Sequence, residues 1–156
     1  MPKHPIEQNM LYFITSVTEN RKQIFSNNLA CELFLNILTY NKFYCDYNIY
    51  AFIIMPDHFH IIIQPTGEMN ISEIMKKIKG NFSRFYNKIF NNQGKVLQKG
   101  YYDKIIRDEK HLIEIIEYIH NNPINKGIVE NVDDYIYSSY HYYNNKNRHY
   151  ELLMRR

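Results

Sequence analysis

Two isoleucine-rich runs joined by a very short connection set the strongest limit on the fold of this chain. The runs cover residues 47–54 and 58–64, and both are apolar and rich in β-branched residues, as buried strands are. Only Met55, Pro56 and Asp57 separate them, and a proline in so short a connection favours a tight turn. We therefore expect an antiparallel β-hairpin near the middle of the chain.

The rest of the chain alternates strand and helix patterns around this hairpin. β-branched and aromatic residues predict strands at 11–18 and 101–107. Apolar residues at helical spacing predict three helices, at about 27–43, 71–90 and 109–122. The order strand, helix, strand, strand, helix, strand, helix contains the β-α-β-β-α-β arrangement of a ferredoxin-like α+β sandwich, which is an antiparallel sheet with helices packed on it.

The sequence also marks where two of these helices begin and where one ends. Asn70 and Glu73 have the spacing of a capping box, and Asp108 is placed to cap the third helix. Pro123 is expected to terminate the third helix, because proline lacks the N–H group that the next turn needs.

Length and composition favour one cytoplasmic domain. With 156 residues the chain can bury a core without disulfides, and we expect a domain over 1–139 and a polar, basic, mobile tail over 140–156. Cys31 and Cys45 do not form a CxxC motif, which suits reduced thiols in the cytoplasm. No run approaches the roughly 18 apolar residues of a membrane span, so neither secretion nor membrane insertion is expected.

The second run of the hairpin begins with two histidines, His58 and His60, separated by Phe59. Side chains alternate faces along a strand, so the two imidazoles point the same way and Phe59 points into the opposite layer. Two imidazoles on one face can clamp a metal ion, and an apolar strand otherwise has little reason to carry them. The alternative is a pair of histidines on a solvated strand face.

The stretch from Lys76 to Arg107 is strongly basic. It contains nine Lys or Arg residues and a single acid, Asp103. Phenylalanine and tyrosine residues are interleaved with these cations, as in a groove that binds a polyanion and stacks on its bases. The alternative is a solvated helix face. We expect nucleic acid to be the main partner.

On the third helix, Tyr118 lies at the boundary of the apolar stripe, and Asn122 follows on the same side one turn later. A lone tyrosine there is usually a structural aromatic. If this helix packs against the face of His58 and His60, however, the amide oxygen and the imidazoles together can hold a cation next to a phenol. The proline at 123 is expected to push Asn122 toward a C-cap conformation.

Seven segments in this order carry a resemblance to a known family: Met55–His60, Met75–Arg84, Gln98–Asp103, Ile106–Glu109, Tyr118–Pro123, Gly127–Val129 and Tyr137–Ser139. The chain resembles the REP-associated tyrosine transposases, a branch of the single-strand insertion-sequence transposases in the HUH endonuclease superfamily. The resemblance extends from Leu11 to Ser139. It departs from the family at Leu97, where tryptophan is common, and at Asp57, where asparagine is usual.

The resemblance implies a metal-dependent endonuclease and strand transferase in which Tyr118 attacks single-stranded DNA and forms a 5′-phosphotyrosine. It implies Mg²⁺ or Mn²⁺ held by His58, His60 and Asn122, and hairpin-forming repeat DNA as the substrate. Charge suggests DNA contacts from Lys76, Lys79, Arg84, Lys99, Arg107, Arg148, Arg155 and Arg156. Related enzymes act as monomers or as dimers that exchange the tyrosine helix, so both states stay open.

Three other functions remain to be weighed. A replication-initiator or relaxase nuclease shares the HUH chemistry, although the small size and the Tyr118–Pro123 segment argue against it. A domesticated descendant binds structured nucleic acid without cutting. A zinc-dependent hydrolase requires a third strong ligand and a carboxylate base, for which only Glu114 and Glu117 are near in sequence.

Overall fold

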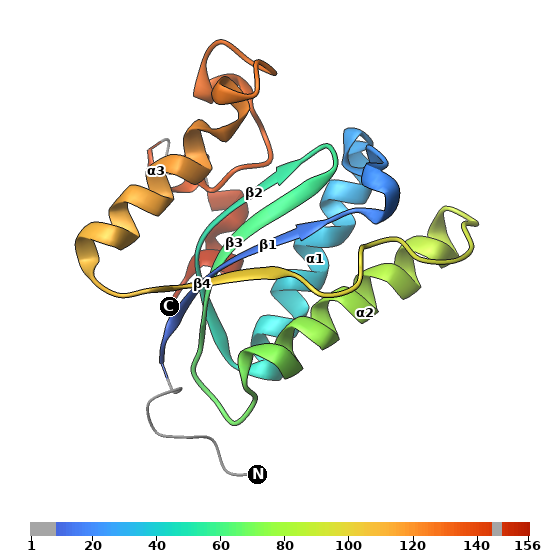
Figure 1. Ribbon diagram of the computed structural model, residues 1–156, viewed down its shortest axis with the longest axis horizontal. Helices are drawn as coiled ribbons and strands as arrows, with labels where there is room; N and C mark the ends of the chain where they lie inside the picture. Colours follow the sequence, from blue (N-terminus) through green and yellow to red (C-terminus); the bar gives the residue numbers. More distant parts are fainter. Residues whose placement is uncertain (1–8, 145–147) are drawn as a thin grey trace.

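The computed structural model describes residues 9–144 and 148–156, and a four-stranded antiparallel sheet forms its centre (Figure 1). The strands are β1 (Leu11–Val17), β2 (Tyr47–Met55), β3 (His58–Pro65) and β4 (Tyr102–Ile106), and they lie in the order β2-β3-β1-β4. Every pairing is antiparallel. The ferredoxin-like α+β sandwich predicted from the sequence is confirmed.

The predicted hairpin is formed by β2 and β3. Met55 pairs with His58 and Ile53 pairs with His60, so the turn consists of Pro56 and Asp57. β3 is also paired with β1 on its other side, which makes it an interior strand of the sheet. The histidines are therefore held by hydrogen-bonded neighbours on both sides.

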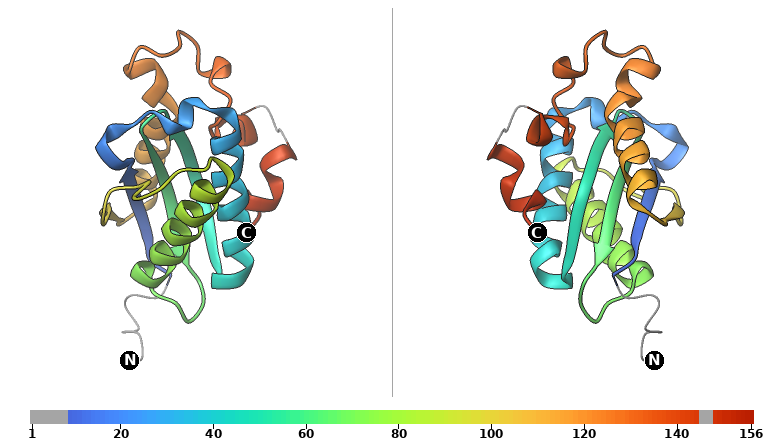
Figure 2. Two further views of the ribbon diagram at one scale, coloured as in Figure 1. Left: turned by 90° about the vertical axis from the view of Figure 1, so that its right-hand side faces the viewer. Right: turned by 90° about the vertical axis from the view of Figure 1, so that its left-hand side faces the viewer.

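The helices form a layer on each face of the sheet (Figure 2). α1 (Asn28–Cys45) and α2 (Ile71–Ile89) pack on one face, and α3 (Glu109–Asn125) covers the other. Within the described residues, the connections also contain the short 3₁₀ helices η2 (Glu19–Arg21), η3 (Ile24–Ser26), η4 (Val132–Asp134) and η5 (Arg148–Tyr150). Throughout residues 9–144 and 148–156, none of the helices combines the length and apolar character needed to cross a membrane.

Phe59 fixes the orientation of β3. Its ring is fully buried between the sheet and α1, with its centroid 4.2 Å from that of Phe34 and 6.4 Å from that of Phe25. Burying a phenylalanine contributes about 1.5–3 kcal/mol. Because side chains alternate along the strand, this burial directs His58 and His60 toward the α3 layer.

The predicted helix starts are confirmed. The Asn70 side chain accepts from the N–H of Glu73, and the Glu73 carboxylate accepts from the N–H of Asn70, which completes the capping box of α2. The Asp108 carboxylate accepts from the N–H of His111 at the start of α3.

The prediction that Pro123 terminates the third helix is wrong. α3 continues to Asn125, and the N–H of Lys126 still donates to the carbonyl of Asn122. Proline removes only its own N–H, so the following turn can form while a single bond is lost. The helix ends instead at Asn125, with Lys126 as its C-cap, and Gly127 follows with a φ of 71° that suits a residue without a Cβ. Asn122 therefore lies inside the helix rather than at its cap.

The C-terminal segment differs from the mobile tail that its composition predicts. After α4 (Tyr140–Tyr143), the chain returns through η5 and α5 (Glu151–Met154). The core between α1 and the sheet also buries Tyr150, Leu153 and Met154, because removing these side chains from water is favourable. The division into 1–139 and 140–156 stays a prediction, and residues 1–8 and 145–147 lie outside the described part.

Lys42 of α1 secures this segment. Its ammonium group donates to the carbonyl of Leu153 at 2.8 Å and also to the carbonyl of Arg155. Burial, followed by the charges of Arg155 and Arg156, lowers the pKa of Lys42 below its usual value. The lysine therefore acts as a cap for the last helix of the chain.

Replacing Lys42 by methionine should lower the free energy of unfolding by about 1 to 3 kcal/mol. The apolar stem is retained, but the carbonyls that the ammonium group bonds lose their donor. Urea denaturation followed by circular dichroism measures the effect. Lys88→Met, at an exposed position of α2, serves as the control, and equal stability of the two variants would contradict the proposed cap.

Candidate active site

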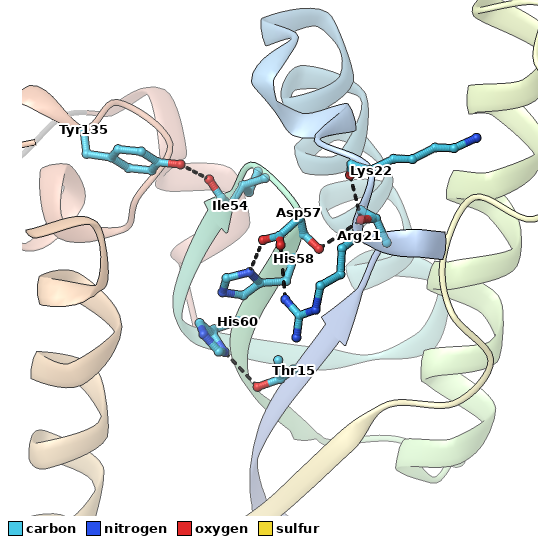
Figure 3. Close-up of polar contacts among 9 residues, drawn as sticks. Thr15, Arg21, Lys22, Ile54, Asp57, His58, His60 and Tyr135 are labelled. Atoms are coloured by element: carbon cyan, nitrogen blue, oxygen red, sulfur yellow. Dashed lines mark hydrogen bonds and ion pairs between the residues drawn. The ribbon is translucent and has the colours of Figure 1, made fainter. Parts of the chain in front are cut away.

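His58 and His60 project from β3 toward α3, and their ring centroids lie 4.8 Å apart. Figure 3 shows both rings on the same side of the strand. His60 is 6% exposed, and it sits in register between Thr15 of β1 and Ile53 of β2. The expectation that the two imidazoles share one face is confirmed.

Each ring is oriented through its Nδ1 atom (Figure 3). His58 donates from Nδ1 to the Asp57 carboxylate at 2.7 Å, and Arg21 contacts the other oxygen of that carboxylate at 3.1 Å. The Nδ1 atom of His60 lies 2.8 Å from the hydroxyl of Thr15. Both rings therefore keep Nε2 for another partner. Metal-binding histidines are commonly oriented in this way.

The protonation states suit ligands of a cation. Burial, followed by the charges of His58 and Lys126, lowers the pKa of His60 to about 3, so its ring is neutral at neutral pH and keeps a lone pair. Burial raises the pKa of the Asp57 carboxyl, but hydrogen bonds and charges of His58 and Arg21 outweigh it and lower the pKa below its usual value. Asp57 is therefore ionised and able to accept from His58.

Tyr118 of α3 lies beside these histidines in the same chain. Its ring centroid is 5.9 Å from that of His60 and 6.1 Å from that of Phe13. Phe13 is stacked on His60 with a centroid separation of 5.2 Å. Tyr118 is 49% exposed, so part of the residue is open to solvent. The structure thus brings together the phenol and the imidazoles that the sequence predicted.

Asn122 lies on the side of α3 that faces His60. It follows Tyr118 by one turn and precedes Lys126 by one turn. The Tyr118 ring contacts the His60 ring, and the Lys126 charge lowers the pKa of His60, so this side of the helix faces His60. Asn122 is 2% exposed, and its Oδ1 atom accepts no hydrogen bond from the described residues. Leaving a buried amide oxygen without a partner costs about 1–3 kcal/mol, which indicates a ligand that the protein itself does not supply.

The donor set fits a divalent cation. Two imidazole nitrogens and one amide oxygen leave positions for water and phosphate oxygens, as Mg²⁺ and Mn²⁺ require. In the described ranges, no group of three or more His, Cys, Asp or Glu residues is placed to hold a metal ion. Glu114 and Glu117, the carboxylates considered for a zinc hydrolase, are exposed on α3.

The cations predicted to bind DNA do not form one surface. Arg84 lies between α1 and α2 in a groove of about 570 Å³, on the opposite face of the sheet from His60, and Lys76 lines a neighbouring groove. Lys79 donates to the carbonyls of Gln98 and Gly100. Lys99 lines a pocket on the face of the histidines.

The remaining cations lie at the ends of the sheet or near the C-terminus. Arg107 and Arg148 are exposed, Arg155 pairs with Glu151 at 3.4 Å, and Arg156 lies over the ring of Tyr50 at 4.3 Å. A role for any of these side chains in DNA binding stays a prediction.

Thr15, Phe13 and Lys126 also belong to the site, and the sequence analysis missed them. Strand alternation places Phe13 and Thr15 on one face of β1, but the pairing of β1 with β3 depends on the register, which the sequence does not display. Lys126 stands eight residues after Tyr118, which is two helical turns. That signal was hidden by the assumption that the helix stops at Pro123.

A buried hydrogen bond of His120, on the side of α3 away from Tyr118, anchors this helix to the sheet. The Nε2 atom of His120 lies 2.8 Å from the hydroxyl of Ser139, and this hydroxyl also accepts from the N–H of Phe52 in β2 at 2.9 Å. Burial, followed by the charge of His141, lowers the pKa of His120 to about 4. The neutral histidine thus connects the helix of Tyr118 with the edge of the sheet.

Comparisons with known proteins identify similar sequences. The sequence model of the family described as transposase IS200 like matches residues 7–122. A Haemophilus influenzae protein named as a candidate REP-associated tyrosine transposase is 30% identical over 141 residues, which cover 84% of this chain and 80% of that protein. The REP-associated tyrosine transposase of Escherichia coli K12 is 27% identical over 96 residues, covering 61% of this chain and 55% of its own length.

Solved structures show the same fold. A REP-associated tyrosine transposase bound to a REP hairpin superposes with a TM-score of 0.75 at 22% identity, over 90% of this chain and 82% of that one. A Deinococcus radiodurans protein named as a candidate transposase superposes with a TM-score of 0.56 at 21% identity, over 78% of this chain and 96% of the other.

Replacing Ser139 by alanine should lower the free energy of unfolding by about 1 to 3 kcal/mol, because the His120 ring loses its buried partner. Urea denaturation at neutral pH measures the loss. Ser26→Ala, at an exposed position, is the matched control. If Ser139→Ala is no less stable than the control, the bond between His120 and Ser139 is not the anchor of α3.

Proposed function

The chain belongs to the IS200-like family of transposases, and we propose that it cuts and rejoins single-stranded DNA at hairpin-associated repeats through a 5′-phosphotyrosine intermediate. It is an enzyme of the tyrosine transposase class. One observation carries the mechanistic proposal: the ring of Tyr118 lies 5.9 Å from that of His60, in a site that also contains His58 and Asn122. Family membership also favours a transposase over a replication-initiator nuclease.

In the proposed cleavage step, the Tyr118 oxygen attacks the phosphorus of a phosphodiester. A bond forms between that oxygen and phosphorus, and the bond from phosphorus to the 3′ oxygen breaks. The phenol proton leaves to solvent, which reaches the half-exposed side chain, and the departing 3′ oxygen takes up a proton. The 5′ end stays on the enzyme as a phosphotyrosine, which conserves the bond energy.

Rejoining is the reverse reaction with a different 3′ end. A 3′ hydroxyl attacks the phosphotyrosine, the new phosphodiester forms, and Tyr118 regains its proton. Neither step consumes a nucleotide cofactor, because the energy of the broken phosphodiester is kept in the tyrosyl ester. One tyrosine can therefore act in both cleavage and joining.

We infer that Mg²⁺ or Mn²⁺ would be held by Nε2 of His58, Nε2 of His60 and Oδ1 of Asn122. The unpartnered oxygen of Asn122 and the occupied Nδ1 atoms support this assignment. When bound, a divalent cation would neutralise charge at the scissile phosphate and stabilise the leaving oxygen. Thr15 and Asp57 orient the two rings.

The substrate is proposed to be single-stranded DNA beside a hairpin. The resemblance to REP-associated transposases suggests it, and the cations of α2 and of the loop at Lys99 supply complementary charge. Tyr118 and His60 meet within one chain, which supports a site assembled in a single protomer.

Replacing Tyr118 by phenylalanine should abolish the covalent DNA conjugate, because the attacking oxygen is removed while the ring is retained. The measurement is denaturing electrophoresis after incubation with hairpin oligonucleotides and Mn²⁺, together with fluorescence anisotropy to show that binding remains. Tyr40→Phe, at an exposed tyrosine of α1, is the control and should leave the conjugate unchanged. A conjugate that persists in Tyr118→Phe would reject the assignment.

Two substitutions distinguish a residue that binds the metal, His58, from a residue that orients its ring, Asp57. His58→Ala should abolish the conjugate at any Mn²⁺ concentration, whereas Asp57→Ala should weaken Mn²⁺ binding about tenfold to hundredfold and recover the conjugate when Mn²⁺ is raised. Titration calorimetry of Mn²⁺ against each variant measures the binding directly. Unaltered Mn²⁺ affinity in both variants would exclude this site.

A further inference from the structure

A pocket of about 230 Å³ lies between β1 and the segment that leads into β4, and no ligand has so far been assigned to it. It is formed by Thr15 and Val17 of β1 and by the segment 98–102 that leads into β4. Val17 pairs with His58, and Thr15 pairs with His60. The pocket therefore lies on the far side of β1 from β3, and its two β1 side chains, Thr15 and Val17, share the face of the sheet that carries the imidazoles.

The residues that line the pocket include a cation, an amide and an exposed aromatic ring. The Lys99 side chain carries a positive charge for a phosphate, Gln98 carries an amide that pairs with base edges, and Tyr102 offers a ring that is 69% exposed. Tyr101 packs toward the main core, so the alternation of side chains directs Tyr102 to the α3 face. An exposed tyrosine ring beside a cation is a platform on which a base can stack.

The loop around the pocket is held in shape before any ligand binds. The ammonium group of Lys79 donates to the carbonyl of Gln98 at 2.8 Å and also to that of Gly100. The N–H of Gln98 donates to the carbonyl of Val17 at 2.8 Å, and Gly100 has a φ of 78° that favours glycine. A pocket that is already formed loses little entropy when it binds.

We propose that this pocket binds one base of the single strand, that of the nucleotide next to the phosphate attacked by Tyr118. Tyr102 stacks on the base, Gln98 contacts its edge, and Lys99 holds the neighbouring phosphate. Thr15 connects the two sites, since it lines the pocket and also orients His60. The pocket thereby selects which base stands beside the cut. This inference rests on the proposed function.

The test captures covalent conjugates from a random-sequence pool of single-stranded DNA in the presence of Mn²⁺ and sequences them. The wild-type protein should show a base preference at one position beside the cleavage point. Tyr102→Ala should lose that preference and bind the pool about tenfold more weakly, whereas Tyr102→Phe should keep both properties because the ring remains. An unchanged preference in Tyr102→Ala would overturn the proposal.

Tyr40→Ala is the matched control, because Tyr40 is similarly exposed but lies on α1, on the opposite face of the sheet. It should leave the base preference intact. If it flattens the preference as strongly as Tyr102→Ala does, the effect is not local and the pocket is not a base site. Inorganic phosphate is added as a competitor of the DNA pool. If it removes all DNA binding equally in the wild type and in Tyr102→Ala, the pocket is only an anion site and the proposal is rejected.

A second measurement does not require cleavage. A thymine oligonucleotide with one 2-aminopurine should lose fluorescence on binding to Tyr118→Phe, through stacking on Tyr102, and this quenching should disappear in the Tyr102→Ala, Tyr118→Phe double variant. Quenching without any wild-type conjugate would support the pocket while rejecting Tyr118 as the nucleophile. Conjugates without Tyr102-dependent quenching would support the nucleophile and reject the pocket.

Discussion

The interior position of β3 is the constraint on which the rest of the structure depends. The strand is paired on both sides, and its alternation places Phe59 in the core with α1 while His58 and His60 face α3. A shift of one residue in its register would bury two imidazoles in the main core and move Phe59 to the α3 face. The burial of Phe59 and its neighbouring isoleucines therefore also positions the two histidines of the proposed active site.

On the α3 side of the site, a buried oxygen without a hydrogen bond within the described ranges lies on a helix that is firmly attached to the sheet. The buried oxygen of Asn122 has no partner in the described chain, which is costly unless a ligand binds there. The same helix is attached to β2 through His120 and Ser139, so it cannot easily turn to relieve that cost. Rigid attachment and an unpartnered ligand atom are what the proposed metal site would require.

Charge alone did not reveal where a strand of DNA would lie. Lys79 belongs to the basic stretch, yet its ammonium group is used to shape the loop at Gln98 and Gly100. Arg84 and Lys99 are close in sequence, but they lie on opposite faces of the sheet. A count of cations therefore indicates the kind of partner, while the direction of each side chain decides which of them can meet it.

Local patterns in the sequence determined the hairpin, the helix caps at Asn70 and Asp108 and the shared face of His58 and His60, because each depends on alternation or on hydrogen bonds within a few residues. Only the tertiary structure decided that Thr15 orients His60, that α3 continues past Pro123 to place Lys126, and that Tyr150 packs into the core. Those contacts join residues that are far apart in the sequence. They are decided by strand register and helix packing, which local patterns do not display.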